Sequence, residues 1–255
     1  MVKTRKINTI DDVLITLDHI ISHSIAENDP AGYFAALYRQ VTFEVKKGIE
    51  TNYFDDGPRM EKLDVIFAQK YIDAYYEWKA GNEISKSWET AFRFAHKKWP
   101  VVLQHLLMGM NAHINLDLGI AAAEVSPGHK INDLRDDFFR INEILASLVS
   151  EVQNNLSTIW PPLKKIVQKS GKLDNLITDF SMELARDGAW KFAEHLATIS
   201  ELYLPDEISI RDEKIVRKAG LVTNPGFGIK LLLFVIRLGE TGNVAEKIIK
   251  LKGKI

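Results

Sequence analysis

The chain contains no cysteine among its 255 residues. This absence excludes disulfide bonds, thiolate zinc sites, iron–sulfur clusters and cysteine nucleophiles. It also fits a reducing compartment. Neither sign of charge is in excess, because 33 Lys and Arg residues face 34 Asp and Glu residues, for a formal net charge of −1. Such a balance provides no global field that would attract nucleic acid or an anionic membrane.

Targeting and membrane-spanning segments are missing as well. The basic residues 1–6 are followed by Asp11 and Asp12 rather than by an apolar signal sequence, so we expect a cytoplasmic protein. The apolar segment 101–123 contains six polar residues that would be costly in lipid. Segment 227–238 is too short to span and is typical of a packed core helix. We therefore predict no membrane span and no nucleic-acid partner.

Standard catalytic motifs are also absent. The sequence has no glycine-rich dinucleotide fingerprint, no phosphate-binding loop, no H-E-x-x-H and no G-x-S-x-G. Nucleotide-driven and serine-hydrolase functions are therefore disfavoured.

What is present is a helical pattern along nearly the whole chain, with almost no strand signals. Asp29-Pro30 indicates a helix start, Gly48 a helix end, and Pro161 and Pro205 helix stops. The predicted helices lie near residues 11–23, 30–47, 60–79, 85–100, 101–123, 132–160, 163–169, 174–204, 207–219 and 226–238, with a last one from about 243. We predict an all-α fold, a multi-helix bundle around a buried central helix at about 101–123. Residues 1–255 are expected to form a single helical domain, and the alternative is a helical C-terminal appendage at 205–255.

The central helix is unusual because it buries polar residues. Each buried polar side chain without a partner costs about 1–3 kcal/mol, and Asn is a poor residue inside a helix. At roughly 100° per residue, Asn111 and Asn115 share one face, while His113 and Asp117 share another. This spacing suits His113 and Asp117 either to ligate one metal ion or to form a carboxylate–imidazole pair. A purely structural polar network that bridges helices is the alternative.

Other polar residues are candidates to act together with His113 and Asp117. His105 precedes His113 by roughly 12 Å along a straight helix, so the two cannot share an ion unless the helix breaks, and Gly109 is the candidate break. Asp64, from a different predicted helix, is a further candidate to approach His113 as a metal ligand. Asn111, Asn115 and Asn142 are candidates for substrate binding.

The central segment also carries a resemblance. Residues 104–118 read Q-H-L-L-M-G-M-N-A-H-I-N-L-D-L and resemble the signature of an uncharacterised bacterial family, a domain of unknown function. The flanking stretches 60–68, 137–142 and 186–190 are similar to that family too, so the resemblance covers roughly residues 30–200. It implies a cytoplasmic helical protein and no established activity. A looser similarity links His105, Gly109, Asn111 and His113 to the H-x-x-G-D-x-H pattern of all-helical zinc phospholipases and nucleases, with Asn in place of the Asp.

Two hypotheses about function follow. In the first, the protein is a hydrolase or lyase that acts on a small, partly apolar substrate. His113 and Asp117 then form a centre with a divalent metal (zinc, iron or manganese) or an acid–base centre, and His105 assists in catalysis. In the second, the protein is a non-catalytic helical module that binds an apolar ligand or a protein partner, and the buried polar residues are structural.

Overall fold

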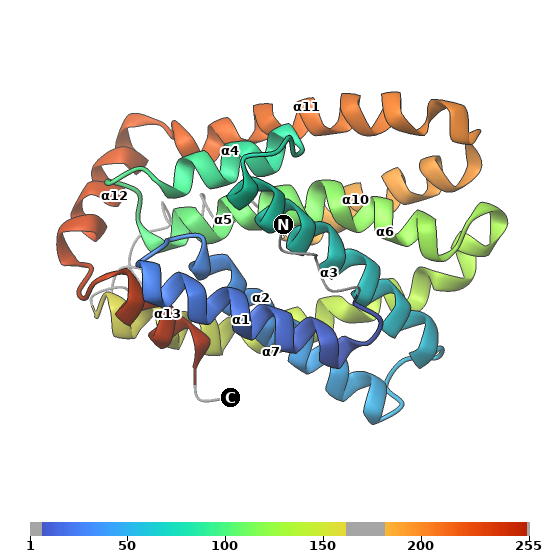
Figure 1. Ribbon diagram of the computed structural model, residues 1–255, viewed down its shortest axis with the longest axis horizontal. Helices are drawn as coiled ribbons and strands as arrows, with labels where there is room; N and C mark the ends of the chain where they lie inside the picture. The colour runs from blue at the N-terminus through green and yellow to red at the C-terminus, as the bar shows by residue number, and fades with distance from the viewer. Residues whose placement is uncertain (1–6, 162–181, 254–255) are drawn as a thin grey trace.

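The computed structural model describes residues 7–161 and 182–253, and within these residues the chain is helical and has no strand. The all-α prediction is therefore confirmed (Figure 1). The α-helices are α1 (Ile10–Glu27), α2 (Gly32–Glu50), α3 (Gly57–Ala80), α4 (Lys86–Ala95), α5 (Val102–Ala112), α6 (Leu118–Val125), α7 (Arg135–Ile159), α10 (Met182–Thr198), α11 (Leu204–Thr223), α12 (Phe227–Gly239) and α13 (Val244–Lys252). The helix predicted at 163–169 lies outside the described residues.

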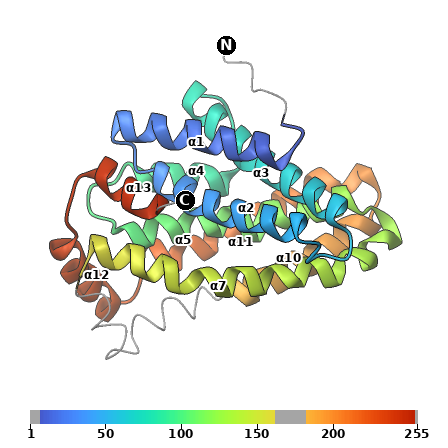
Figure 2. The same ribbon diagram turned by 90° about the horizontal axis from the view of Figure 1, so that it is seen from below.

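A buried central rod organises the bundle, as predicted. It consists of α5, a π-helix (His113–Asp117) and α6, and every residue from 111 to 122 is buried. Helices α2, α3, α4, α10 and α11 pack around this rod. In Figure 2, α1 lies on one side of the molecule and α7 on the other, with α2 and α5 between them. The sequence analysis did not predict the π-helix. Such helices are rare in proteins, and those that occur are often at functional sites.

Side-chain caps explain where four of the helices begin. Thr9 caps α1, Asp56 caps α3 and Ser85 caps α4, each by accepting a hydrogen bond from a backbone N–H of the first turn. α13 begins with a capping box between Asn243 and Glu246.

Two expectations about glycine and proline were wrong, and the candidate break at Gly109 is not present. Gly48 does not end α2, which continues to Glu50, because a Cβ at this position would lie 2.8 Å from the Phe54 ring and the glycine allows that ring to pack closely. Gly109 does not break the central helix either. A Cβ there would lie 2.5 Å from the ring of Phe34 on α2, so Gly109 permits α2 and α5 to approach. Pro205 starts α11, where its missing N–H costs nothing, rather than stopping α10.

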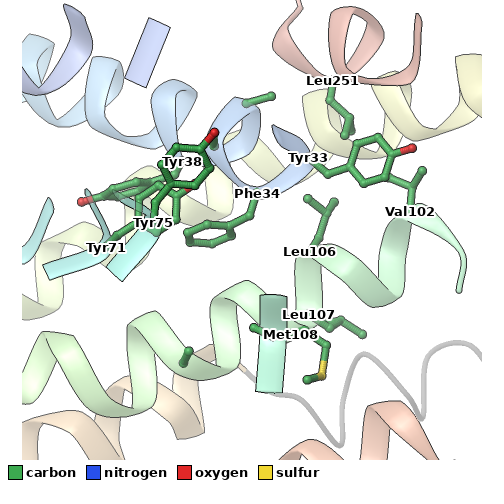
Figure 3. Close-up of a cluster of buried hydrophobic side chains, with 14 of the residues drawn as sticks. Tyr33, Phe34, Tyr38, Tyr71, Tyr75, Val102, Leu106, Leu107, Met108 and Leu251 are labelled. Atoms are coloured by element: carbon green, nitrogen blue, oxygen red, sulfur yellow. The ribbon is translucent and has the colours of Figure 1, made fainter. Parts of the chain in front are cut away.

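An aromatic cluster fills the space between the central rod and helices α2 and α3. Figure 3 shows Phe34 and Tyr38 beside Tyr71, to the left of the α5 segment that carries Leu106. Phe34 and Tyr71 meet edge to face, with ring centroids 5.1 Å apart and an interplanar angle of 83°. This cluster fixes how α2 and α3 sit on the rod.

The C-terminal segment packs into the same bundle. α13 contacts α1, α2 and α7, and the Gln40 side chain donates a 2.7 Å hydrogen bond to the carbonyl of Leu251. α11 contacts α4 and α5, and Asp212 of α11 accepts hydrogen bonds from the backbone of Lys86 and Ser87. These contacts join α11 and α13 to the helices of the N-terminal part of the chain.

Across residues 7–161 and 182–253, no single helix is long and apolar enough to cross a membrane. The pair Glu201–Thr223 and Phe227–Gly239 meets that length and composition test only jointly, and it is bent by 68°.

Candidate functional site

A buried imidazole–carboxylate pair lies in the π-helix. His113 Nδ1 is 3.0 Å from Asp117 Oδ2, and the same carboxylate oxygen accepts a 2.8 Å hydrogen bond from Trp88 Nε1 of α4. The two side chains that the sequence placed on one face are thus brought together. In the tautomer that donates to Asp117 through Nδ1, a neutral imidazole presents Nε2 as an acceptor.

Aromatic rings surround this imidazole. The His113 ring stacks on Phe67 with centroids 3.6 Å apart and an interplanar angle of 5°, and it meets the Tyr38 ring edge to face with centroids 4.5 Å apart. Burial lowers the pKa of His113 below its ordinary value of 6.5, against the opposing effect of the hydrogen bond to Asp117. The ring is therefore neutral at pH 7. Its Nε2 is buried and has no hydrogen-bond partner.

His113 lines a cavity of about 220 Å³ between α2, α3, α5 and α7. The lining is dominated by aliphatic, aromatic and methionine side chains, among them Leu107, Met110 and Leu148. Its side chains with polar groups are Tyr38, Asp64, His113, Gln153 and Arg186. The described part of the chain thus contains an apolar cavity with a few polar groups, which is the usual make-up of a small-molecule site.

Asp64 brings a second unsatisfied group to this cavity. Its Oδ2 is buried without a hydrogen-bond partner. Burial, and to a smaller extent the charge of Glu61, raises the pKa of Asp64 to about 8. The carboxyl group is therefore mostly protonated at neutral pH, and in that form it carries an O–H donor.

Arg186 of α10 is a third buried polar group at the cavity. Its guanidinium donates a hydrogen bond to the carbonyl of Phe138 and lies over that ring at 4.7 Å, but its Nε has no partner. Burial lowers its pKa to about 9. Arg186 does not pair with Asp117, whose carboxylate bonds to His113 and Trp88.

Among the described residues, the other buried carboxylates are well paired, which makes Asp64 an exception. Asp137 accepts hydrogen bonds from the backbone N–H groups of Asp55 and Asp56 and from Arg140, and it lies 3.5 Å from Arg59. Buried polar groups normally find partners, so an unsatisfied one calls for an explanation such as a ligand.

The remaining polar residues of the central rod face away from the cavity. Asn111 donates to the carbonyl of Ile215 at 3.1 Å, and Asn115 donates to Asn111 at 3.3 Å. Asn115 also accepts from Arg211 through its carbonyl and from Lys218 through its side chain. This side of the rod is therefore hydrogen-bonded to α11, and the substrate-binding role of Asn111 and Asn115 stays a prediction.

His105 and Asn142 are not brought to His113. The His105 ring packs against Tyr33 and Phe94, with centroids 5.4 and 5.7 Å away, and burial lowers its pKa to about 4. Neither His105 nor Asn142 is among the described residues that line the cavity. The sequence analysis did not identify Tyr38, Phe67 and Gln153 as cavity residues. On an amphipathic helix, residues that line a cavity follow the same periodic pattern as residues of the core.

A metal centre receives no support from this geometry. Within the described ranges, no group of three or more His, Asp and Glu side chains is arranged to hold a metal ion. His113 and Asp117 are hydrogen-bonded to each other, and Asp64 lines the same cavity without forming a ligand cluster with them.

Comparison with known proteins gives a family but no activity. No curated protein and no solved structure matches the chain. The sequence model of a family of unknown function, DUF5995, matches residues 10–225. The match extends beyond the range 30–200 over which we noted a resemblance, at both ends, and it includes α11. The chain therefore belongs to the DUF5995 family of unknown function.

Proposed function

We propose that this protein binds a small, mostly apolar organic molecule with a hydroxyl group in the cavity between α2, α3, α5 and α7. The observation that carries the proposal is that two buried atoms without a hydrogen-bond partner, Asp64 Oδ2 and His113 Nε2, belong to side chains that line one mostly apolar cavity. Each such group costs about 1–3 kcal/mol in the empty protein. A ligand that satisfies them offsets this cost.

The size of the cavity suits a compact ring compound. An apolar cavity of about 150 Å³ accommodates benzene. The cavity here is about 220 Å³, so it has room for a ligand larger than benzene. Phe67 and Tyr38 offer aromatic surface, and leucines from α5 and α7 offer aliphatic surface.

The polar groups favour an alcohol or a phenol over a hydrocarbon. A neutral His113 accepts a hydrogen bond at Nε2, and a protonated Asp64 donates one. A hydroxyl group is both donor and acceptor, so it complements both groups. Both side chains are uncharged at neutral pH, so a neutral hydroxyl group complements them better than an ionised group does.

Thermal shift with matched ligand pairs tests the proposal. Cyclohexanol, phenol and 2-naphthol are compared with cyclohexane, benzene and naphthalene. We expect the hydroxylated member of at least one pair to raise the melting temperature more than its parent hydrocarbon. Failure of every compound to shift the melting temperature, or an equal shift within every pair, refutes the hydroxyl-specific site.

Two variants locate the binding in the cavity. Val41→Phe fills the cavity and should abolish the shift, whereas Val216→Phe, a half-buried valine of α11 outside the cavity lining, should leave it unchanged. Asp64→Leu removes the donor, so it should retain binding of the hydrocarbon and lose the preference for the alcohol. Circular dichroism confirms that each variant is folded.

A second candidate function is an acid–base enzyme, a hydrolase or lyase, and the His113–Asp117 pair favours it. In this function His113 Nε2 accepts a proton from the bound molecule or from a water, and the Asp117 carboxylate stabilises the resulting imidazolium. Compounds that bind are incubated with the protein and analysed by mass spectrometry. Conversion that is lost in His113→Gln supports the enzyme, and unchanged compounds support binding alone.

The metal-dependent form of that enzyme is tested separately. Elemental analysis of untagged, chelator-free protein measures zinc, iron and manganese. About one equivalent of metal that disappears in His113→Ala supports a metal centre, whereas a metal content that is the same in both proteins favours the acid–base form.

A further inference from the structure

The C-terminal helix α12 exposes an apolar stripe. The sequence predicted a packed core helix here, but only Leu233 and Ile236 of α12 are buried. Phe227, at 84% exposure, and Leu238, at 68%, lie on the opposite surface. Phe227, Leu231, Phe234 and Leu238 are exposed and fall within an arc of roughly 60° on the helix.

Trp99 extends this stripe from another part of the chain. It lies in the connection between α4 and α5, it is 66% exposed, and its ring stacks on Phe234 with centroids 6.1 Å apart. We call Trp99, Phe227, Leu231, Phe234 and Leu238 the α12 patch. In Figures 1 and 2, α12 lies at one end of the molecule, away from α6 and α10.

A basic pocket adjoins the patch. It has a volume of about 540 Å³, and its lining includes Trp99 and Phe234 together with the four cations Lys97, Lys98, Lys230 and Arg237. No Asp or Glu is among its described lining residues. Arg237 is partly engaged, because it donates to the Lys98 carbonyl and lies 3.5 Å from Glu240. Lys98 and Lys230 are exposed and form no ion pair with the described residues.

We propose that the α12 patch docks on the surface of a membrane that contains anionic phospholipids. The helix then lies in the plane of the interface, with its aromatic and leucine side chains among the acyl chains and the lipid phosphates in the basic pocket. Exposed Trp, Phe and Leu on one face, with Lys and Arg along the border, form the pattern of interfacial helices. The attraction is local, since a net charge of −1 provides none over the whole molecule.

The geometry of α12 supports this occupant. Lys230 and Arg237 follow Phe227 by three and ten residues, which places both on the same side of the apolar stripe at roughly 100° per residue. That side is also the side of Lys98, whose carbonyl accepts from Arg237. One edge of the stripe is therefore basic, as headgroups beside acyl chains require. The cavity beside His113 has a separate lining, so this inference does not depend on the proposed ligand.

Vesicle flotation tests the inference with the intact protein. Vesicles of phosphatidylcholine are compared with vesicles that also contain phosphatidylglycerol. We expect binding to the anionic vesicles only, with release at high salt. The variant Lys98→Gln/Lys230→Gln should bind about 30-fold more weakly, because each lysine near the surface contributes about 1 kcal/mol. The control Lys62→Gln/Lys191→Gln removes two exposed lysines from α3 and α10 and should bind normally.

The apolar part has its own matched test. Phe227→Ser/Leu238→Ser should weaken vesicle binding by at least about tenfold, since each side chain loses its burial in the acyl region. Leu202→Ser/Tyr203→Ser changes two exposed residues before α11 and should have no effect. All four substituted positions are exposed, so we expect folded variants by circular dichroism.

Three outcomes would overturn the inference. The first is no binding of the intact protein to anionic vesicles, or equal binding to neutral ones. The second is a loss of binding in both control variants that matches the loss in the patch variants. The third is a dimer, detected by analytical ultracentrifugation, that disappears in Phe227→Ser/Leu238→Ser while vesicle binding is unaffected, because the patch then serves a second copy of this chain.

Discussion

Replacement of Asp64 by Asn should stabilise the protein. The Asp64 carboxyl is buried, lacks a partner for Oδ2, and has its pKa raised from 3.8 to about 8. The unfolded chain ionises this group near pH 3.8, whereas the folded protein keeps it protonated up to about pH 8. Folding therefore loses stability as pH rises from about 4 to 8, by about 1.4 kcal/mol per pH unit. Asn has nearly the same shape and does not ionise.

The expected gain at pH 7 is about 2–4 kcal/mol. The pKa shift by itself corresponds to about 4 kcal/mol at that pH. The lower figure of about 2 kcal/mol allows for the amide of the Asn variant, which is also unpartnered. Its hydrogen-bonding groups differ from those of the protonated carboxyl that it replaces. Urea unfolding of both proteins at pH 4, 5.5, 7 and 8 measures the difference. It should vanish near pH 4 and increase with pH.

Asp137→Asn is the matched control, because Asp137 is equally buried but well paired. This substitution removes charge from a carboxylate that faces Arg59 and Arg140 and accepts two backbone N–H groups. It should destabilise the protein at pH 7 by about 1–3 kcal/mol. If Asp64→Asn also destabilises at pH 7, or its effect does not change with pH, the picture of an unpaired, protonated Asp64 is refuted.

Three further outcomes are expected. The pKa of His105 is lowered to about 4 in the folded protein, whereas in the unfolded chain this side chain takes up its proton near pH 6.5. The free energy of unfolding should therefore fall by about 3 kcal/mol between pH 6.5 and about 4. His105→Leu should flatten that slope in urea titrations, and an unchanged slope would contradict the burial. Gly109→Ala should destabilise the protein by about 1–3 kcal/mol, because its Cβ meets an α2 ring at 2.5 Å. Gly220→Ala, in open space within α11, should stabilise the protein by about 0.5–1 kcal/mol. Equal effects of the two substitutions in thermal melts would refute the close approach of α2 and α5. Trp88→Phe leaves Asp117 one donor short and should lower the unfolding free energy by about 1–3 kcal/mol in urea, and a neutral result would argue against the hydrogen bond.

Sequence alone determined the helical class and the position of the central rod. The helical period of apolar residues and local caps such as Ser85 and Asn243 act within a few residues, so they can be read without tertiary contacts. The same holds for the two polar faces of the rod, because residues four apart share a face. This spacing predicted that His113 and Asp117 would either ligate one metal ion or form a pair, and in the structure the two side chains are hydrogen-bonded.

Tertiary structure decided what those faces meet. Only the packing of distant helices puts Asn111 and Asn115 against α11 and His113 against a cavity. The sequence does not show that Asp64 lacks a partner, because the lack depends on every helix around it. Likewise, the apolar composition of α12 does not distinguish a core helix from an exposed one. Burial is a property of the assembled fold, so a single chain segment does not specify it.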